Sequence, residues 1–174
     1  MADYVITTDS NSDVLPEFIK ENDLTVIPQY YAFGDTVYGD ELNMEPHEFY
    51  ETMRNGELPK SMANNPAVIR ERFEKILKEG KDILHIAFSS ALSGSCNNVM
   101  MTANELLEDY PERRIVVFDS LNASLGEGVS VYRAVELWKA GKTMDEVYDV
   151  LMEEREHVNV SFTVNDLNHL QRGG

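Results

Sequence analysis

One stretch near the middle of the chain, residues 82–99, restricts the fold more than any other. Residues 82–89 (DILHIAFS) are mostly apolar with little alternation, which is typical of a strand buried on both faces of a parallel sheet. The apolar positions that follow recur with the spacing of one helix face: Leu92, Cys96, Val99, Met100, Ala103 and Leu107. The sequence therefore predicts a buried strand, a polar turn and an amphipathic helix, with Ser93 at the N-cap position.

The turn between this strand and this helix is rich in hydroxyl groups. Ser89, Ser90, Ser93, Gly94 and Ser95 bring hydroxyls and free backbone N–H groups to the point where the helix dipole is positive. Such a turn is suited to bind a carboxylate or a phosphate. The same residues also cap helices and fill turns in ordinary proteins, so this stretch alone leaves both interpretations open.

The rest of the chain alternates between strand-like and helical patterns. Strand-like runs occupy residues 4–8, 24–33, 82–89 and 115–118, and helical patterns lie at about 16–21, 45–55, 69–80, 92–107, 123–142 and 144–151. Pro28 predicts an edge or a break in the second run, Gly34-Asp35 predicts a hairpin turn, and residues 58–66 (LPKSMANNP) predict a loop. This order is typical of an α/β fold, with a mainly parallel sheet flanked by helices.

Three of these strands end in polar residues of the same kind. The first ends at Asp9 and Ser10, the third runs into residues 89–95, and the fourth ends at Asp119 and Ser120. Open α/β sheets bind ligands at the carboxyl ends of their strands, so we expect these three turns to line one crevice.

The last residues predict the beginning of a second unit. Residues 159–164 (NVSFTV) have a strand-like pattern, and residues 166–172 resemble the opening of a helix. We therefore expect an α/β domain over residues 1–158 and, over residues 159–174, the start of a second α/β domain that is truncated.

Composition excludes several classes of partner. The chain has 31 acidic and 15 basic residues, a net charge of −16, which disfavours nucleic acid and anionic membrane surfaces. No apolar run is long enough to span a bilayer, and the N-terminus lacks a secretory signal, so we expect a cytoplasmic protein without membrane insertion. Cys96 is the single cysteine, which excludes an internal disulfide and a cysteine-based metal cluster; we expect it to be a buried helix residue and expect no cofactor.

Six stretches share their order and spacing with a known family: TTDSNSDVLPEF, VIPQYYAFGDTVYGD, LPKSMANNP, FSSALSGSCNNV, VVFDSLNASLGEG and FTVNDLNHLQRGG. Together they resemble the DegV family, fatty-acid-binding proteins of bacteria. The resemblance implies a two-domain α/β protein that holds one long-chain fatty acid, with its tail buried and its carboxylate bound between the domains. It also implies a carrier that presents the acid to a separate fatty acid kinase.

The resemblance places the carboxylate contacts at Ser61, where the family has threonine, and at Ser93 with Gly94. Ser95 of the same turn and the residues at the other strand ends, Ser10, Asp119 and Ser120, complete the candidate ligand site. Hydroxyls and helix-start N–H groups can hold an anionic head without a buried cation.

An enzyme is the alternative, namely a hydrolase or phosphotransferase that uses Ser93 or Asp9 as nucleophile in the same crevice. The chain contains no G-x-S-x-G motif. Its four histidines show no spacing that pairs a base with a serine: His47, His85, His157 and His169. A strand position such as that of His85 is more typical of a core residue, so the sequence favours a carrier that is not itself catalytic.

Overall fold

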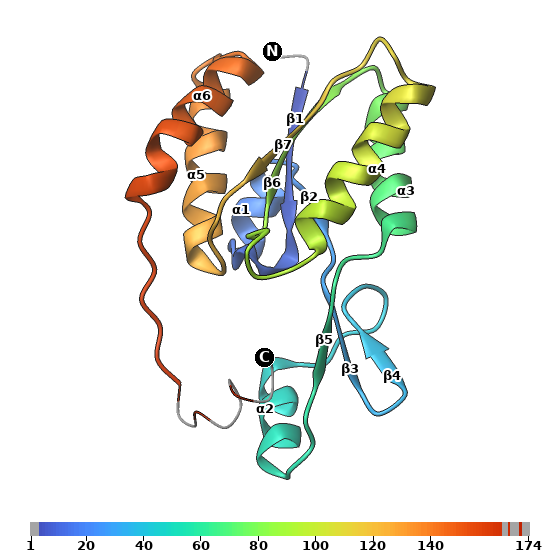
Figure 1. The fold of residues 1–174 in the computed structure, drawn as a ribbon, viewed down its shortest axis with the longest axis vertical. Helices are drawn as coiled ribbons and strands as arrows, with labels where there is room; N and C mark the ends of the chain where they lie inside the picture. Colours follow the sequence, from blue (N-terminus) through green and yellow to red (C-terminus); the bar gives the residue numbers. More distant parts are fainter. Residues whose placement is uncertain (1–3, 165–166, 168–170, 172–174) are drawn as a thin grey trace.

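The computed structural model describes residues 4–164, 167 and 171. Four strands form a parallel sheet in the order β2–β1–β6–β7 (Figure 1): β1 (Tyr4–Asp9), β2 (Thr25–Ile27), β6 (Asp82–Ala87) and β7 (Ile115–Asp119). The predicted α/β fold with a mainly parallel sheet is confirmed. The strands run in one direction, so β1, β6 and β7 end at one side of the sheet, which we call the carboxyl edge.

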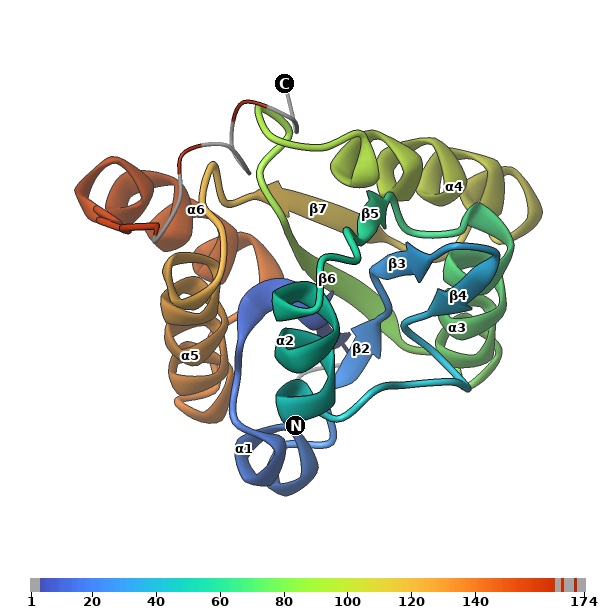
Figure 2. The same ribbon diagram turned by 90° about the horizontal axis from the view of Figure 1, so that it is seen from below.

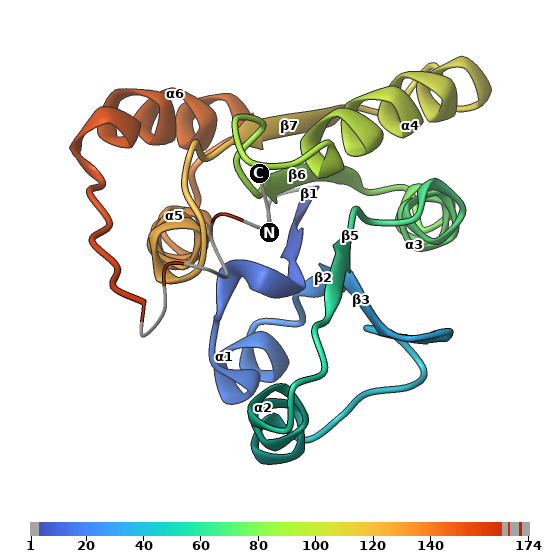
Figure 3. The same ribbon diagram turned by 60° about the horizontal axis from the view of Figure 1, so that its bottom comes forward.

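Helices cover both faces of this sheet (Figure 3). On one face lie α1 (Pro16–Glu21), α5 (Leu125–Lys139) and α6 (Met144–Glu154); on the other lie α3 (Pro66–Lys78) and α4 (Ser95–Asp109). Strand β6 serves both cores, because Leu84 and Ile86 pack toward α5 and α6 while Ile83 packs toward α3 and α4. This double burial explains its continuous apolar sequence.

A second, smaller sheet lies beyond the carboxyl edge (Figure 1). It is antiparallel, in the order β4–β3–β5: β3 (Tyr30–Phe33), β4 (Thr36–Tyr38) and β5 (Lys60–Met62), and it is accompanied by α2 (Pro46–Arg54). The break at Pro28 and the hairpin turn at Gly34-Asp35 are confirmed. The prediction of a loop throughout 58–66 is wrong, because β5 pairs with β3; its three exposed residues lack the alternation that marks a strand.

Two short 3₁₀ helices, η1 (Ser10–Ser12) and η2 (Arg155–His157), follow β1 and α6. Cys96 is fully buried in α4, as predicted, and burial raises the pKa of its thiol to about 11. None of the helices in the described part of the chain combines the length and the apolar character needed to cross a membrane.

The chain after η2 differs from expectation. The predicted strand over 159–164 is wrong: these residues are irregular and exposed, and in the part of the chain that the structure describes no strand hydrogen-bonds to them. A single strand without a neighbour leaves its N–H and C=O groups unpaired, so an apolar pattern alone does not stabilise a strand. The helix predicted over 166–172 lies outside the described residues, apart from Leu167 and Gln171. The domain boundary at residue 158 stays a prediction.

A substitution at Gly128 can test the packing of α5 against the carboxyl edge. A Cβ at this position would lie 2.5 Å from the carbonyl oxygen of Ser12 in η1, closer than side-chain carbons approach backbone oxygens. Gly128→Ala should therefore lower the free energy of unfolding by about 1–3 kcal/mol, measured by urea denaturation. Gly94→Ala is the control, because a Cβ there meets nothing within 4 Å and the backbone is helical at φ −70°. Equal stability of the two variants would contradict this account of the contact.

Candidate functional site

Seen from the carboxyl edge (Figure 2), the ends of the parallel strands lie beside the small sheet. Two hydrogen-bond networks occupy this edge, one centred on Ser95 and one on Asp119. They share the turn between β6 and α4, where the carbonyl of Ser89 accepts hydrogen bonds from the N–H groups of Leu92 (3.1 Å) and Ser93 (3.2 Å).

The first network, which we call the amide–serine network, joins Ser10, Gln29, Asn64, Ser93 and Ser95. The Ser95 hydroxyl donates to Gln29 Oε1 (2.8 Å) and accepts from the N–H of Asn64 (3.3 Å). Ser93 Oγ lies 3.0 Å from Ser95 Oγ, and the N–H of Gln29 donates to Ser10 Oγ (2.9 Å). Segments far apart in sequence thus meet at the first residue of α4.

Ser93 is not the N-cap of this helix, which corrects the sequence prediction. Gly94 holds that position, and the Ser93 hydroxyl instead accepts a hydrogen bond from the N–H of Ser95 (3.2 Å). The helix begins one residue later than expected because the turn after β6 is closed by bonds to Ser89. The N–H groups of Cys96 and Asn97, in the first turn of α4, have no acceptor among the described residues.

Asp9 lies beneath this network and is completely buried. Its Oδ2 accepts the N–H of Phe88 (2.9 Å), and its Oδ1 accepts from the side-chain amide of Asn64 (3.5 Å). His85 Nε2 is 3.7 Å from Asp9 Oδ1, while its Nδ1 lies 2.9 Å from the hydroxyl of Thr7. Asp9 therefore ties the end of β1 to the start of the β6–α4 turn and to the segment before α3.

Glu127 is a second buried carboxyl group at this edge, in the first turn of α5. Its Oε1 accepts from the hydroxyl of Thr8 (3.0 Å), and its side chain is fully buried. Burial, with the nearby charge of Asp9, raises the pKa of Glu127 to about 9, although the bonds from Thr8 and from the N–H of Asp9 oppose this rise. Glu127 is therefore neutral at physiological pH.

The second network is built around Asp119. Its Oδ1 accepts the N–H groups of Ser90 (3.1 Å) and Leu121 (3.1 Å), and its Oδ2 accepts the Ser90 hydroxyl. Ser120 is buried and donates to the carbonyl of Asn122 (3.2 Å). Both predicted site residues in this network are thus engaged in turn bonds. The structure brings Ser10, Ser93, Gly94 and Ser95 together, and it places Asp119 and Ser120 in a neighbouring network of their own.

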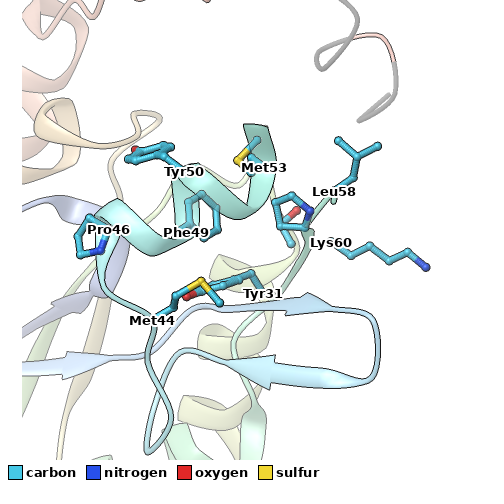
Figure 4. Close-up of a pocket in the computed structure, with 10 residues that line it drawn as sticks. Tyr31, Met44, Pro46, Phe49, Tyr50, Met53, Leu58 and Lys60 are labelled. Carbon is cyan, nitrogen blue, oxygen red and sulfur yellow. The ribbon is translucent and has the colours of Figure 1, made fainter. Parts of the chain in front are cut away.

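Ser61 lies elsewhere, on β5, where it is exposed and pairs with Tyr31 of β3. It borders an apolar hollow of about 750 Å³ between α2 and the small sheet (Figure 4). Tyr31 and Met44 lie on one side of this hollow, across from Phe49 on α2. The lining is mostly apolar or aromatic: Tyr31, Met44, Pro46, Phe49, Tyr50, Met53, Leu58, Pro59, Lys60 and Ser61. Such a surface suits a hydrocarbon chain.

Sequence reasoning missed three residues of the edge, namely Gln29, Asn64 and Glu127. Gln29 follows Pro28 inside a strand-like run, and Asn64 lies in a predicted loop; both stretches resemble the family, but neither residue carries a local signal of a ligand contact. Glu127 lies between two glycines, a pattern that signals close packing of the backbone but not burial of the acid. In the described residues, no three side chains among His, Cys, Asp and Glu are arranged to hold a metal ion.

Comparison with known proteins establishes the family of this fold. The sequence profile of the DegV family, a group described as uncharacterised proteins, matches residues 3–174. The chain belongs to the DegV family. A DegV domain-containing protein of Clostridium perfringens is 38% identical over the whole chain. The chain spans about 60% of the length of that relative.

Solved DegV family structures share this fold. A protein from Thermus thermophilus, described by its fatty acid binding, superposes with a TM-score of 0.85 at 28% identity. A stearic-acid-binding protein from Eubacterium ventriosum superposes with a TM-score of 0.87 at 25% identity. Each match covers 98% of this chain and 59% of the other. The family assignment from the sequence motifs is confirmed.

Glu127 makes the stability of this DegV fold depend on pH. Its pKa is about 9 when folded and close to 4.5 when unfolded, so between these values the folded state holds a proton that the unfolded state has lost. The free energy of unfolding should therefore fall as pH rises through this window, by up to about 1.4 kcal/mol per pH unit for this group.

Glu127→Gln removes the titrating group but keeps the hydrogen-bonding shape. Urea denaturation from pH 5 to pH 8 should show this variant gaining stability over the wild type as pH rises. Glu17→Gln, on the exposed surface of α1, serves as the control and should follow the wild type. A Glu127→Gln profile parallel to that of the wild type would rule out the neutral buried acid.

Proposed function

We propose that this chain binds a long-chain fatty acid, with the carboxylate held at the amide–serine network and the tail along the apolar hollow. One observation carries the proposal: uncharged donors converge at the start of α4 beside a surface that suits hydrocarbon. Two DegV structures whose descriptions name fatty acid or stearic acid binding support it by likeness of fold.

The head-group chemistry follows from the donors present. Ser93 offers a half-buried hydroxyl, and the N–H groups of Cys96 and Asn97 stand at the positive end of the α4 dipole. Hydrogen bonds to an ionised acceptor are about twice as strong as neutral ones, so a few of them hold a carboxylate without a cation. This matters in a chain whose net charge is −16, because the long-range field repels anions.

The small sheet connects the head-group donors to the hollow. Tyr31 pairs with Ser61 on the β3–β5 ladder, and Gln29 lies two residues before Tyr31 along the same chain. Two residues of strand span about 7 Å. A carboxylate at the amide–serine network therefore leaves its first methylene groups near Ser61, at the rim of the hollow. This placement puts Ser61 beside the start of the hydrocarbon chain, while its predicted contact with the carboxylate stays a prediction.

The geometry favours a carrier over the hydrolase or phosphotransferase alternative. Asp9 is buried and its two oxygens accept hydrogen bonds, which leaves it poorly placed to attack a substrate. Among the described residues, the Ser93 hydroxyl forms hydrogen bonds with Ser95. No histidine or carboxylate in this part of the chain is hydrogen-bonded to Ser93, so none is placed to act as its general base. Presentation of the bound acid to a fatty acid kinase, and completion of the site by a second domain beginning near residue 159, are parts of the same proposal.

Ser93→Ala tests the head-group role. The variant loses one hydrogen bond to a charged group, so palmitate affinity in a calorimetric titration should fall by about 1–3 kcal/mol. The control is Ser90→Ala, three residues away in the same turn, whose hydroxyl bonds to Asp119 and lies outside the amide–serine network. The role of Ser93 is rejected if the two variants bind palmitate equally well.

Met53→Asp tests the tail. Met53 is half-buried and borders the hollow on α2. A carboxylate there must be desolvated by the acyl chain, so palmitate affinity should fall by about tenfold or more. Met101→Asp is the matched control, because Met101 is 63% exposed on α4. Unchanged affinity in Met53→Asp would place the tail elsewhere, while loss in both variants would point to net charge and not to the hollow.

A further inference from the structure

Gln29 has one unusual feature for a residue so close to the carboxyl edge. Its amide oxygen accepts the Ser95 hydroxyl at 2.8 Å, but its amide nitrogen, Nε2, is buried and has no hydrogen-bond partner in the described structure. A buried N–H donor without an acceptor is destabilising, so such a group calls for an explanation. Neither the family motifs nor the strand-end pattern points to this side chain.

The assignment of donors and acceptors in the amide–serine network shows which donors remain for a ligand. Ser95 has a single hydroxyl proton, and it goes to Gln29 Oε1. In the 3.0 Å contact between the two serines, Ser93 must therefore be the donor and Ser95 the acceptor. The hydroxyl protons of Ser93 and Ser95 are thus both engaged. Among the buried side-chain nitrogens of the network that the structure describes, Gln29 Nε2 is the one without a hydrogen-bond partner.

We propose that Gln29 is a further head-group ligand, which donates a hydrogen bond from Nε2 to the carboxylate of the bound acid. This rests on the proposed function and names a residue outside the ligand site predicted from the sequence. The donor is neutral, so it contributes to recognition of a singly charged carboxylate without adding a buried cation. Occupation of the site supplies the acceptor that Nε2 lacks.

The backbone of Gln29 is fixed in place before any ligand arrives. Its N–H donates to Ser10 Oγ (2.9 Å), and Pro28 restricts the chain directly before it. Its carbonyl is in contact with Gly39, where the Cβ of any other residue would collide with the carbonyl oxygen. A donor that is positioned in advance loses little freedom on binding.

The terminal torsion of the side chain remains free to adjust. Gln29 as a residue is only half-buried, and this torsion is soft in glutamine. A small rotation about it brings Nε2 into contact with a ligand oxygen. Ser93 then turns its hydroxyl from Ser95 toward the same carboxylate.

The test compares two probes on two variants. Palmitate and hexadecanol have carbon chains of the same length, but only palmitate carries a carboxylate. Gln29→Leu replaces the amide with an apolar group of similar size, and Gln29→Glu places a negative charge at the same point. Palmitate affinity should fall about tenfold in Gln29→Leu and further in Gln29→Glu, with hexadecanol affinity unchanged in both.

A direct spectroscopic readout follows ligand binding in the wild type and uses Gln29→Leu only to assign one signal. In the ¹H–¹⁵N spectrum of the wild type, the side-chain NH₂ signal that disappears in Gln29→Leu should shift when palmitate is added and stay in place with hexadecanol. An unmoved signal at saturation overturns the inference, and so does an equal loss of both probes in the variants, which would indicate a structural role. Failure of the wild type to bind palmitate at all would instead overturn the proposed function.

Discussion

The carboxyl edge depends on the buried carboxylate of Asp9. Strand β1 delivers this group to the point where β6 ends, and its two oxygens accept the N–H of Phe88 and the amide of Asn64. A buried charge of this kind is costly unless its hydrogen bonds are made, so the native arrangement of both partners is favoured together. Through Asn64, which donates to Ser95, the same carboxylate fixes the first turn of α4. Asp9 is thus a structural residue that positions the candidate site from below.

How far the sequence predicts this molecule depends on how local each signal is. The buried strand β6, the break at Pro28 and the hairpin at Gly34-Asp35 follow from neighbouring residues, and all three appear in the structure. Strand β5 has no local signal, because only its pairing with β3 makes it a strand. Residues 159–164 show the reverse case: they have a strand pattern, and no described strand pairs with them.

The candidate site, too, was predictable only where the signal is local. Parallel strands end at one edge, so the gathering of Ser10 with Ser93 and Ser95 was predictable from the ends of β1 and β6. Their connection through Gln29 was not, because it joins residues 66 positions apart in sequence and no local pattern marks the Gln29 side chain as a contact of Ser95. Asp119 and Ser120 lie at the predicted edge, but their polar atoms form hydrogen bonds within turns. A sequence pattern does not distinguish residues that stabilise a turn from residues that bind a ligand.

Electrostatics explains why neutral groups suit this edge. The chain has about twice as many acidic as basic residues, and Asp9 and Asp119 both lie at the carboxyl edge. A second ionised acid beside Asp9 would repel an incoming carboxylate further, but Glu127 is kept neutral by its burial and by Asp9 itself. The carboxylate of Asp9 accepts hydrogen bonds from donors of its own, the N–H of Phe88 and the side-chain amide of Asn64. In the proposed site, an anionic ligand would face a set of hydroxyl, amide and helix N–H dipoles. Dipoles held in place by the fold would attract the proposed head group at short range without needing to overcome the acidity of the whole chain.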